Sequence, residues 1–272
     1  MTLQPPEAPW TGGPAPGAAA PVARCVLAPN PGPMTLEGTN TWVLGSPDAA
    51  RVLVVDPGPD DEAHLERVLG AARERGARVA EVLLTHGHAD HSAGARRFAE
   101  LAGAGVRALD PAHRLGSEGL ADGDTVEVDG LRLDVVGTPG HSADSLCFVL
   151  PEQGGVLTGD TVLGRGTAVV AHPDGRLADY LHSLERLRRL SEELGLTGVL
   201  PGHGPPLDRP LQVVEGYLRH RKERLDQVRA AVAAGARTAA EVVPVVYADV
   251  DRVLWPAAEL SVRAQLDYLG VT

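Results

Sequence analysis

The sequence predicts a layered α/β fold followed by a small helical module. Short apolar runs typical of buried strands alternate with amphipathic helices, which is the pattern of proteins that pack helices on mixed sheets. Beyond Pro210 the pattern becomes wholly helical. The shares of hydrophobic and charged residues, 43% and 22%, are ordinary for a globular protein. We therefore expect the 272 residues to form one large body and one small addition.

The chain begins with a segment, residues 1–21, that is rich in proline, glycine and alanine. Because residues of this kind can bury little apolar surface, we expect this segment to be disordered or to lie extended over the surface of the protein. It lacks both the basic start and the apolar centre of a secretion signal. No later stretch has the apolar length of a membrane span. We therefore expect a cytoplasmic protein with no membrane partner.

The large body should contain strands and helices in two series. In the first series, apolar runs predict strands at 23–28, 39–45, 51–56 and 79–84, with helices at 61–75 and 91–102. In the second series they predict strands at 105–108, 124–128, 131–137, 144–150, 155–159 and 197–200. A helix at 177–194 has leucines spaced by three or four residues, so it should lay one stripe on a sheet before Gly195 ends it.

Three helices make up the expected addition. Along the first helix, one face collects the apolar residues Val213, Val214, Tyr217, Leu218, Leu225, Val228 and Val232, and Gly235 ends it. Thr238 and Glu241 have the spacing of a capping box at the start of the second helix, and Pro256 begins the third. The basic stretch 219–224 is interpreted as a solvated helix face.

Charge and cysteine content exclude several classes of protein. The formal net charge of -11 disfavours binding to a phosphate backbone, which needs clustered Lys and Arg. Cys25 and Cys147 lie in separate apolar runs, so we expect buried free thiols rather than a disulfide framework or a metal–thiolate pair. Both thiols fit a reducing compartment.

The most informative motif is Thr-His-Gly-His-Ala-Asp-His, which directly follows the strand predicted at 79–84. It brings His86, His88, Asp90 and His91 into one glycine-containing loop. Neutral imidazoles with a carboxylate suit zinc or a similar transition metal. The alternative is a surface loop whose histidines bind nothing, but ligand-type residues at this density seldom occur without a metal.

Three later loops repeat this design. Each follows an apolar strand and presents a polar residue beside a glycine, which should let the backbone turn sharply. The residues so presented are His141 in Thr-Pro-Gly-His-Ser, Asp160 in Thr-Gly-Asp-Thr and His203 in Pro-Gly-His-Gly. Together with the first loop they form a strong candidate metal site.

In full and in order, these motifs resemble the His-x-His-x-Asp-His, His, Asp and His pattern of the metallo-β-lactamase superfamily over residues 22–207. The resemblance implies a four-layer αββα sandwich with the metals at one edge between two sheets. It implies that one metal is held by His86, His88 and His141, and a second by Asp90, His91 and His203, with Asp160 as the bridge. It also implies that Asp56, in Asp-Pro-Gly, hydrogen-bonds the ligand loop rather than binding metal.

Residues 208–272 resemble the winged-helix tail of the superfamily branch that includes endoribonucleases and acyl-thioester hydrolases, most clearly from Tyr217 to Leu269. Few residues remain for the strands of a wing. We therefore expect this module to pack against the body or to form a homodimer rather than to bind nucleic acid.

The resemblance implies metal-assisted hydrolysis. Two Zn²⁺ per chain, with Fe or Mn as other candidates, would lower the pKa of a shared water, and Asp90 would orient the resulting hydroxide or take its proton. The expected substrate is a small ester, thioester or related acyl compound. Three alternatives are cleavage of single-stranded RNA, an iron-dependent sulfur dioxygenase, and a non-catalytic regulatory protein that keeps its metals for structure.

Four residues are candidates for substrate contact. Met34 and Leu36 lie in the loop 30–40, which is either a flap over the metals or a plain connection. Tyr180 resembles a position that faces the cleft in the same branch, or is a core aromatic. His172 is a loop histidine that either contacts substrate or is only solvated.

Overall fold

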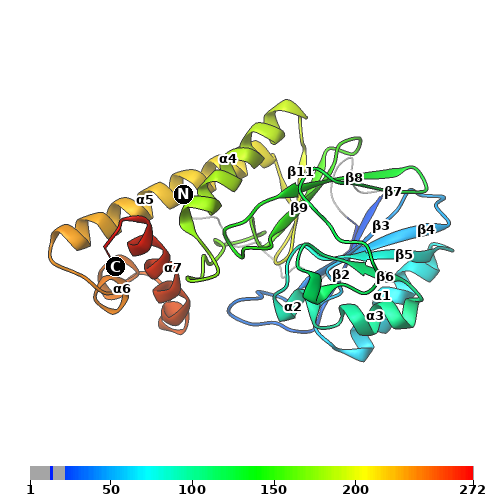
Figure 1. The fold of residues 1–272 in the computed structure, drawn as a ribbon, viewed down its shortest axis with the longest axis horizontal. Coiled ribbons are helices and arrows are strands. Elements are labelled where there is room, and N and C mark those ends of the chain that lie inside the picture. The colour runs from blue at the N-terminus through cyan, green and yellow to red at the C-terminus, as the bar shows by residue number, and fades with distance from the viewer. Residues whose placement is uncertain (1–12, 15–21, 272) are drawn as a thin grey trace.

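The computed structural model describes residues 13–14 and 22–271, and it confirms the αββα sandwich. Two six-stranded sheets face each other, with α1 and α3 on the outer face of one and α4 on the outer face of the other (Figure 1). Of the segment 1–21, Gly13–Pro14 (β1) pairs antiparallel with the next strand. The rest of that segment lies outside the described residues.

The first sheet has the order β1-β2-β3-β4-β5-β6. Its strands after β1 are β2 Ala23–Leu27, β3 Asn40–Leu44, β4 Arg51–Val55, β5 Arg78–Leu83 and β6 Gly105–Arg107. Pairing is antiparallel as far as β4, and then parallel from β4 through β6. Parallel neighbours need a crossover, which α1 (Glu62–Glu74) and α3 (Ala95–Ala102) provide.

The second sheet has the order β12-β11-β10-β9-β8-β7. Its strands are β7 Thr125–Val128, β8 Leu131–Gly137, β9 Leu146–Leu150, β10 Gly155–Gly159, β11 Gly198–Pro201 and β12 Leu207–Asp208. Only β10 and β11 run parallel, joined by α4 (Leu177–Glu193). The sequence does not predict β1 and β12, because a strand of two residues carries no periodicity.

Three apolar layers hold the sandwich together. Inward side chains of both sheets, including Trp42 and Phe148, form the central layer. The outer face of the first sheet packs on α1 and α3. The outer face of the second packs on α4, whose leucine stripe includes Leu184 and Leu187, and on the start of α5. The stripe expected from the leucine spacing is therefore confirmed.

The helix expected at 91–102 is instead two helices. A short α2 (Ala89–Ser92) carries the ligand loop, and α3 begins at Ala95. Between them the Gly94 N–H donates to Gly58 O at 2.9 Å, and a Cβ on Gly94 would lie 2.7 Å from Pro59 O. The break lets the chain after Asp56 pass close to the ligand loop.

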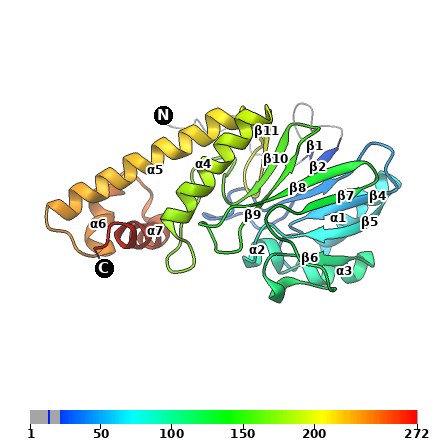
Figure 2. The same ribbon diagram turned by 45° about the horizontal axis from the view of Figure 1, so that its top comes forward.

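The C-terminal module contains α5 Pro210–Ala233, α6 Ala239–Val246 and α7 Trp255–Tyr268, with short 3₁₀ turns at Arg252–Leu254 and, in the body, Pro111–His113. Both hydrogen bonds of the capping box between Thr238 and Glu241 are present. Within the part of the chain that the structure describes, no strand follows β12. Figure 2 shows α5 running beside α4 before it leaves the sandwich.

Among the residues that the structure describes, no helix combines the length and the apolar character needed to cross a membrane.

Candidate metal centre

The strand directions bring all the predicted ligand loops to one edge of the sandwich. Strands β4 and β5 are parallel, as are β10 and β11, and β8 runs in the direction of β10 because β9 reverses between them. The loops that follow these strands carry, in chain order, Asp56, then His86 to His91, then His141, Asp160 and His203. Each sheet therefore contributes one side of the site.

Three ligand atoms from both sheets meet at a first point. The Nδ1 atom of His88 lies 3.0 Å from Nε2 of His86 and 3.0 Å from Nε2 of His141. A tetrahedral zinc with bonds of about 2.0–2.1 Å separates its ligand atoms by about 3.3 Å. The three nitrogens thus have the spacing of ligands around one cation.

A second point lies beside the first. Here the Nε2 atom of His203 is 3.2 Å from Nε2 of His91 and 3.1 Å from Oδ2 of Asp90. The spacing is again that of atoms arranged around one ion.

Asp160 lies between the two points. Its Oδ1 is 3.4 Å from Nε2 of His91, and its Oδ2 is 3.4 Å from Nε2 of His203 and 3.7 Å from Nε2 of His141. Oδ1 is buried and accepts no hydrogen bond from the described residues. A buried carboxylate oxygen without a donor is costly, so this atom fits a position that a cation occupies. The residues present therefore fit a pair of divalent ions.

Outward hydrogen bonds fix which nitrogen of each imidazole faces the centre. In three rings Nδ1 points away: to Asp56 Oδ2 at 2.8 Å for His91, to Val169 O at 2.7 Å for His141, and to Gly38 O at 3.2 Å for His203. Such outer contacts set the tautomer and orientation of metal-binding histidines.

Asp56 lies behind the ligand loop. Its carboxylate accepts from the Thr85 N–H at 2.8 Å and from the Thr85 hydroxyl at 2.6 Å, besides contacting His91. The same hydroxyl lies 3.0 Å from Nδ1 of His86 and can accept from it. One buried carboxylate therefore orients a ligand at each of the two points.

Electrostatics at the centre favour added positive charge. Burial opposes a charge on His91, yet the Asp160 and Asp56 carboxylates raise its pKa well above the usual value. Burial likewise opposes a charge on Asp160, yet His203 and His91 hold its pKa well below the usual value. At His86, burial and the neighbouring imidazoles lower the pKa and keep the ring neutral, which is the form that binds metals. A cation at this centre would take the place of the positive charge that the two carboxylates favour on His91.

The candidate substrate residues fall into two groups. Met34 is 48% exposed, and Leu36 packs close to Gly204, so the loop 30–38 lies beside the candidate ligand His203. His172 is partly exposed, three residues after Val169. In contrast, Tyr180 has no exposed surface, and its hydroxyl donates to Thr161 O at 2.7 Å. Tyr180 thus occupies a core position behind the site.

Gly140 and Gly159 adopt positive φ values of 137° and 46°, as expected for sharp turns, but Gly202 does not. A Cβ on Gly202 would lie 2.6 Å from Oδ1 of Asp160 and 2.7 Å from Cε1 of His91. A glycine is therefore needed at position 202 because the backbone passes close to the Asp160 and His91 side chains, and not because the chain turns there.

Two buried polar residues near the site do not follow from the sequence interpretation. His64 is fully buried and hydrogen-bonds Thr41, which in turn donates to Asp56 O. Arg221 is 6% exposed, so the interpretation of the stretch 219–224 as a solvated face is wrong at this position. A signal is present for Arg221, because it falls four residues after Tyr217 on the apolar stripe of α5.

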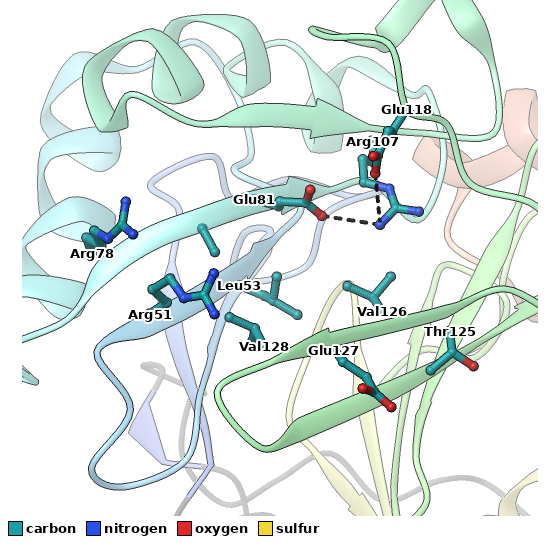
Figure 3. Close-up of a pocket in the computed structure, with 11 residues that line it drawn as sticks. Arg51, Leu53, Arg78, Glu81, Arg107, Glu118, Thr125, Val126, Glu127 and Val128 are labelled. Atoms are coloured by element: carbon teal, nitrogen blue, oxygen red, sulfur yellow. Dashed lines mark hydrogen bonds and ion pairs between the residues drawn. The ribbon is translucent and has the colours of Figure 1, made fainter.

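A separate polar cavity of about 340 Å³ opens between β4 to β6 and β7 (Figure 3). Arg107 lies between the carboxylates of Glu81 and Glu118, at 3.3 and 3.8 Å. None of the predicted ligands lines this cavity, so it belongs to no part of the metal centre.

Residues 34–203 match the family model described as the metallo-beta-lactamase superfamily, and residues 238–269 match the beta-lactamase associated winged helix domain. The chain is 36% identical over 239 residues to the atrochrysone carboxyl ACP thioesterase of Aspergillus fumigatus, covering 82% of this chain and 72% of that protein. It is 32% identical over 270 residues to the beta-lactamase-like protein 2 homolog of Drosophila melanogaster, covering 90% and 86%.

Among solved structures, a metallo-beta-lactamase family protein from Thermus thermophilus superposes with a TM-score of 0.74 at 25% identity, covering 92% of this chain and 93% of that one. The likeness therefore extends over both the sandwich and the helical module.

Proposed function

Because this chain belongs to the metallo-β-lactamase superfamily and has the ligand set of a metal-dependent hydrolase, we propose that it hydrolyses a small acyl substrate at two zinc ions. Thioesters are the first candidate bond and esters the second. The ions would be held by His86, His88 and His141, by Asp90, His91 and His203, and by Asp160 between them.

One observation carries this proposal, the arrangement of two ligand triplets around one shared carboxylate whose Oδ1 accepts no hydrogen bond from the described residues. With Asp160 shared, each ion would have four protein ligands, three of its own and one in common. A pair of ions held in this way is typical of two-metal hydrolases, and the partly exposed Asp90 carboxylate leaves the pair accessible to water and substrate. This favours catalysis over the regulatory alternative.

The bound ions would supply Lewis acidity, which acidifies water and polarises a carbonyl oxygen. The chain itself supplies orientation and proton transfer. The Asp90 carboxylate is 29% exposed, whereas the imidazoles of His91 and His203 have no exposed surface. Asp90 can therefore face an incoming water, orient it and accept its proton. Asp56 and Thr85 keep the imidazoles aimed while this happens.

The choice of an acyl substrate has two supports. One relative is named a carboxyl ACP thioesterase, and the chain covers 72% of it. The loop 30–38 carries apolar residues, Met34 and Leu36 among them, and its Gly38 carbonyl lies beside His203, so the loop would offer an acyl chain an apolar surface near the ions. The net charge of -11 and the helical module without wing strands in its described part weigh against RNA.

The test measures release of free thiol from short and long acyl-CoA thioesters by the zinc-loaded protein. We expect turnover that EDTA abolishes and zinc restores. The variant Asp90→Asn should lose about 10²–10⁴-fold in kcat, since a positioned base contributes that much. Turnover that survives both EDTA and Asp90→Asn would contradict the mechanism.

The same preparation distinguishes the other functions. Cleavage of a single-stranded RNA with no thioester turnover would assign the endoribonuclease alternative. Oxygen consumption with a persulfide by the iron-loaded form would assign the dioxygenase. Stoichiometric metal binding with none of these activities would assign a regulatory role.

A further inference from the structure

The segment 161–170, which joins Asp160 to the residues before His172, touches the metal centre at three places. It begins directly after the bridging carboxylate. Its Gly164 N–H donates to His203 O at 2.8 Å. Its Val169 carbonyl accepts from Nδ1 of His141 at 2.7 Å. The position of this one segment therefore affects ligands at both metal points.

The other side of the segment is held by the C-terminal module. The Tyr217 hydroxyl accepts from the Leu163 N–H at 2.9 Å and lies 3.2 Å from Gly166 O. The Val170 N–H donates to the Ser261 hydroxyl of α7 at 3.4 Å. Between these contacts, Nη2 of Arg221 donates to Ala168 O.

Arg221 is an unusual residue to find in this place. It is 6% exposed, its Nε has no partner among the described residues, and none of their carboxylates forms an ion pair with it. Burying an unpaired cation costs several kcal/mol, so a guanidinium here needs a compensating role.

The compensation comes from Tyr180 and from the segment itself. The guanidinium carbon lies 4.8 Å from the centroid of the Tyr180 ring, a cation–π contact. The Tyr180 hydroxyl donates to Thr161 O at 2.7 Å. Arg221 therefore holds the segment at both ends, directly at Ala168 and through Tyr180 at Thr161, the residue after Asp160.

We propose that Arg221 is a positioning residue of the metal centre, which fixes the segment 161–170 and thereby aims His141 and Asp160. The Ala168 carbonyl and the Val169 N–H belong to one planar peptide unit. A shift of that unit moves the Val169 carbonyl away from Nδ1 of His141. The module that resembles a winged helix thus serves here as a support for the metal site, an inference that rests on the proposed function.

The test compares Arg221 with Arg224, which also contacts an aromatic ring and a backbone carbonyl and in addition pairs with Asp249. Arg224 lies on the same helix, 4.6 Å from the Tyr247 ring centroid, and it donates to Val246 O inside the module. The variants Arg221→Met, Arg221→Lys and Arg224→Met are prepared in the full chain. Zinc affinity is measured by competition with a chelator, and the cobalt-loaded absorption spectrum reports ligand geometry.

We expect Arg221→Met to weaken binding of at least one zinc by about ten- to hundredfold, the usual effect of losing an outer contact of a metal ligand. Its cobalt spectrum should change. Arg221→Lys keeps a charged donor and should bind with intermediate affinity. Arg224→Met should keep the zinc affinity and the cobalt spectrum of the wild type, even if its melting temperature falls as much as that of Arg221→Met.

If Arg221→Met does not fold, Tyr217→Phe removes a second hold on the same segment and should weaken zinc binding in the same direction. Wild-type affinity and spectrum in every foldable Arg221 and Tyr217 variant would overturn the inference alone. An equal loss of affinity in Arg224→Met would also overturn it. Failure of the wild-type chain to bind two ions would overturn the proposed function, and this inference with it.

Discussion

Asp56 connects the two ligand groups of the metal centre without being a candidate ligand itself. It reaches His91 directly and His86 through the Thr85 hydroxyl. Its own backbone has a φ of 50°, an uncommon conformation for a residue other than glycine. The surrounding hydrogen bonds stabilise this strained conformation, and the conformation places the Asp56 carboxylate behind both imidazoles.

Gly202 provides a test of how tightly the ligands are packed. In Gly202→Ala, the new methyl would overlap Asp160 Oδ1 and His91 Cε1, at 2.6 and 2.7 Å. Because both side chains are fixed by other contacts, we expect at least a loss of about tenfold in zinc affinity, as for lost outer contacts. Chelator competition measures it.

Gly198→Ala is the matched control for this change. Gly198 lies in β11, the strand that Gly202 directly follows, and a Cβ on Gly198 would meet nothing within 4 Å. It should bind zinc as the wild type does. Equal affinities for both alanine variants and the wild type would show that the packing at Gly202 does not constrain the ligands.

His64 links the stability of the fold to pH. Burial, with the Arg67 guanidinium adding to it, lowers the pKa of His64 from 6.5 to about 4. The unfolded chain therefore takes up a proton near pH 6.5, whereas the folded chain does so only near pH 4. The stabilisation from neutral His64 is complete above pH 6.5 and is lost as the pH falls towards 4.

In His64→Gln this contribution to the pH dependence is removed. Between pH 6.5 and 4, we expect the free energy of unfolding of the wild type to fall more steeply than that of the variant, by up to about 1.4 kcal/mol per pH unit. Urea denaturation of both proteins in excess EDTA measures the difference without a metal contribution. Parallel curves would contradict the assignment to His64.

At the scale of single elements, most helices are determined by patterns within their own few turns of sequence. The leucine stripe of α4 and the capping box of α6 follow from spacings of a few residues, and both occur as expected. The division into α2 and α3 is different. It depends on the close approach of Gly94 to Gly58 and Pro59, which come from another loop.

The capping box gives an expected stability change for one element. Thr238→Ala removes the hydroxyl that accepts from the Glu241 N–H, so unfolding free energy should fall by about 1 kcal/mol. Chemical denaturation followed by circular dichroism measures this. Thr238→Ser keeps the acceptor and should stay near the wild type. Identical stability of the alanine and serine variants would contradict a stabilising hydrogen bond from the Thr238 cap.

At the scale of the whole molecule, the candidate metal centre joins the two sheets. His86 and His88 follow β5 of the first sheet, whereas His141, Asp160 and His203 belong to loops of the second. Ions that bind only the folded chain should therefore stabilise the sandwich as a unit. With free zinc at about a thousand times Kd, linkage amounts to about 4 kcal/mol per site.

Removal of metal should consequently lower the melting temperature, on the order of 10 °C for a chain of this size. Differential scanning calorimetry with and without EDTA checks this, and added zinc should restore the higher value. Asp160→Asn, which lacks the bridging charge, should show a smaller difference. An EDTA-treated protein that melts at the same temperature as the zinc-loaded one would contradict a stabilising metal pair.

The amino-acid sequence alone establishes which residues are ligand types and that they follow strand ends, because both features are encoded within a few neighbouring positions. It also predicts the strands of more than two residues, the helices and their caps to within a few residues, apart from the division into α2 and α3. The metallo-β-lactamase resemblance added the order of the layers, which periodicity does not contain.

The surroundings of the polar side chains come from the tertiary fold. Arg221 and His64 are buried, Tyr180 lies behind the site and Gly202 serves close approach, because distant parts of the chain pack against each of them. The orientation of each imidazole depends on similarly distant carbonyls and carboxylates. Local patterns state which face of an element is apolar, but burial of a single polar group depends on what the rest of the chain places over it.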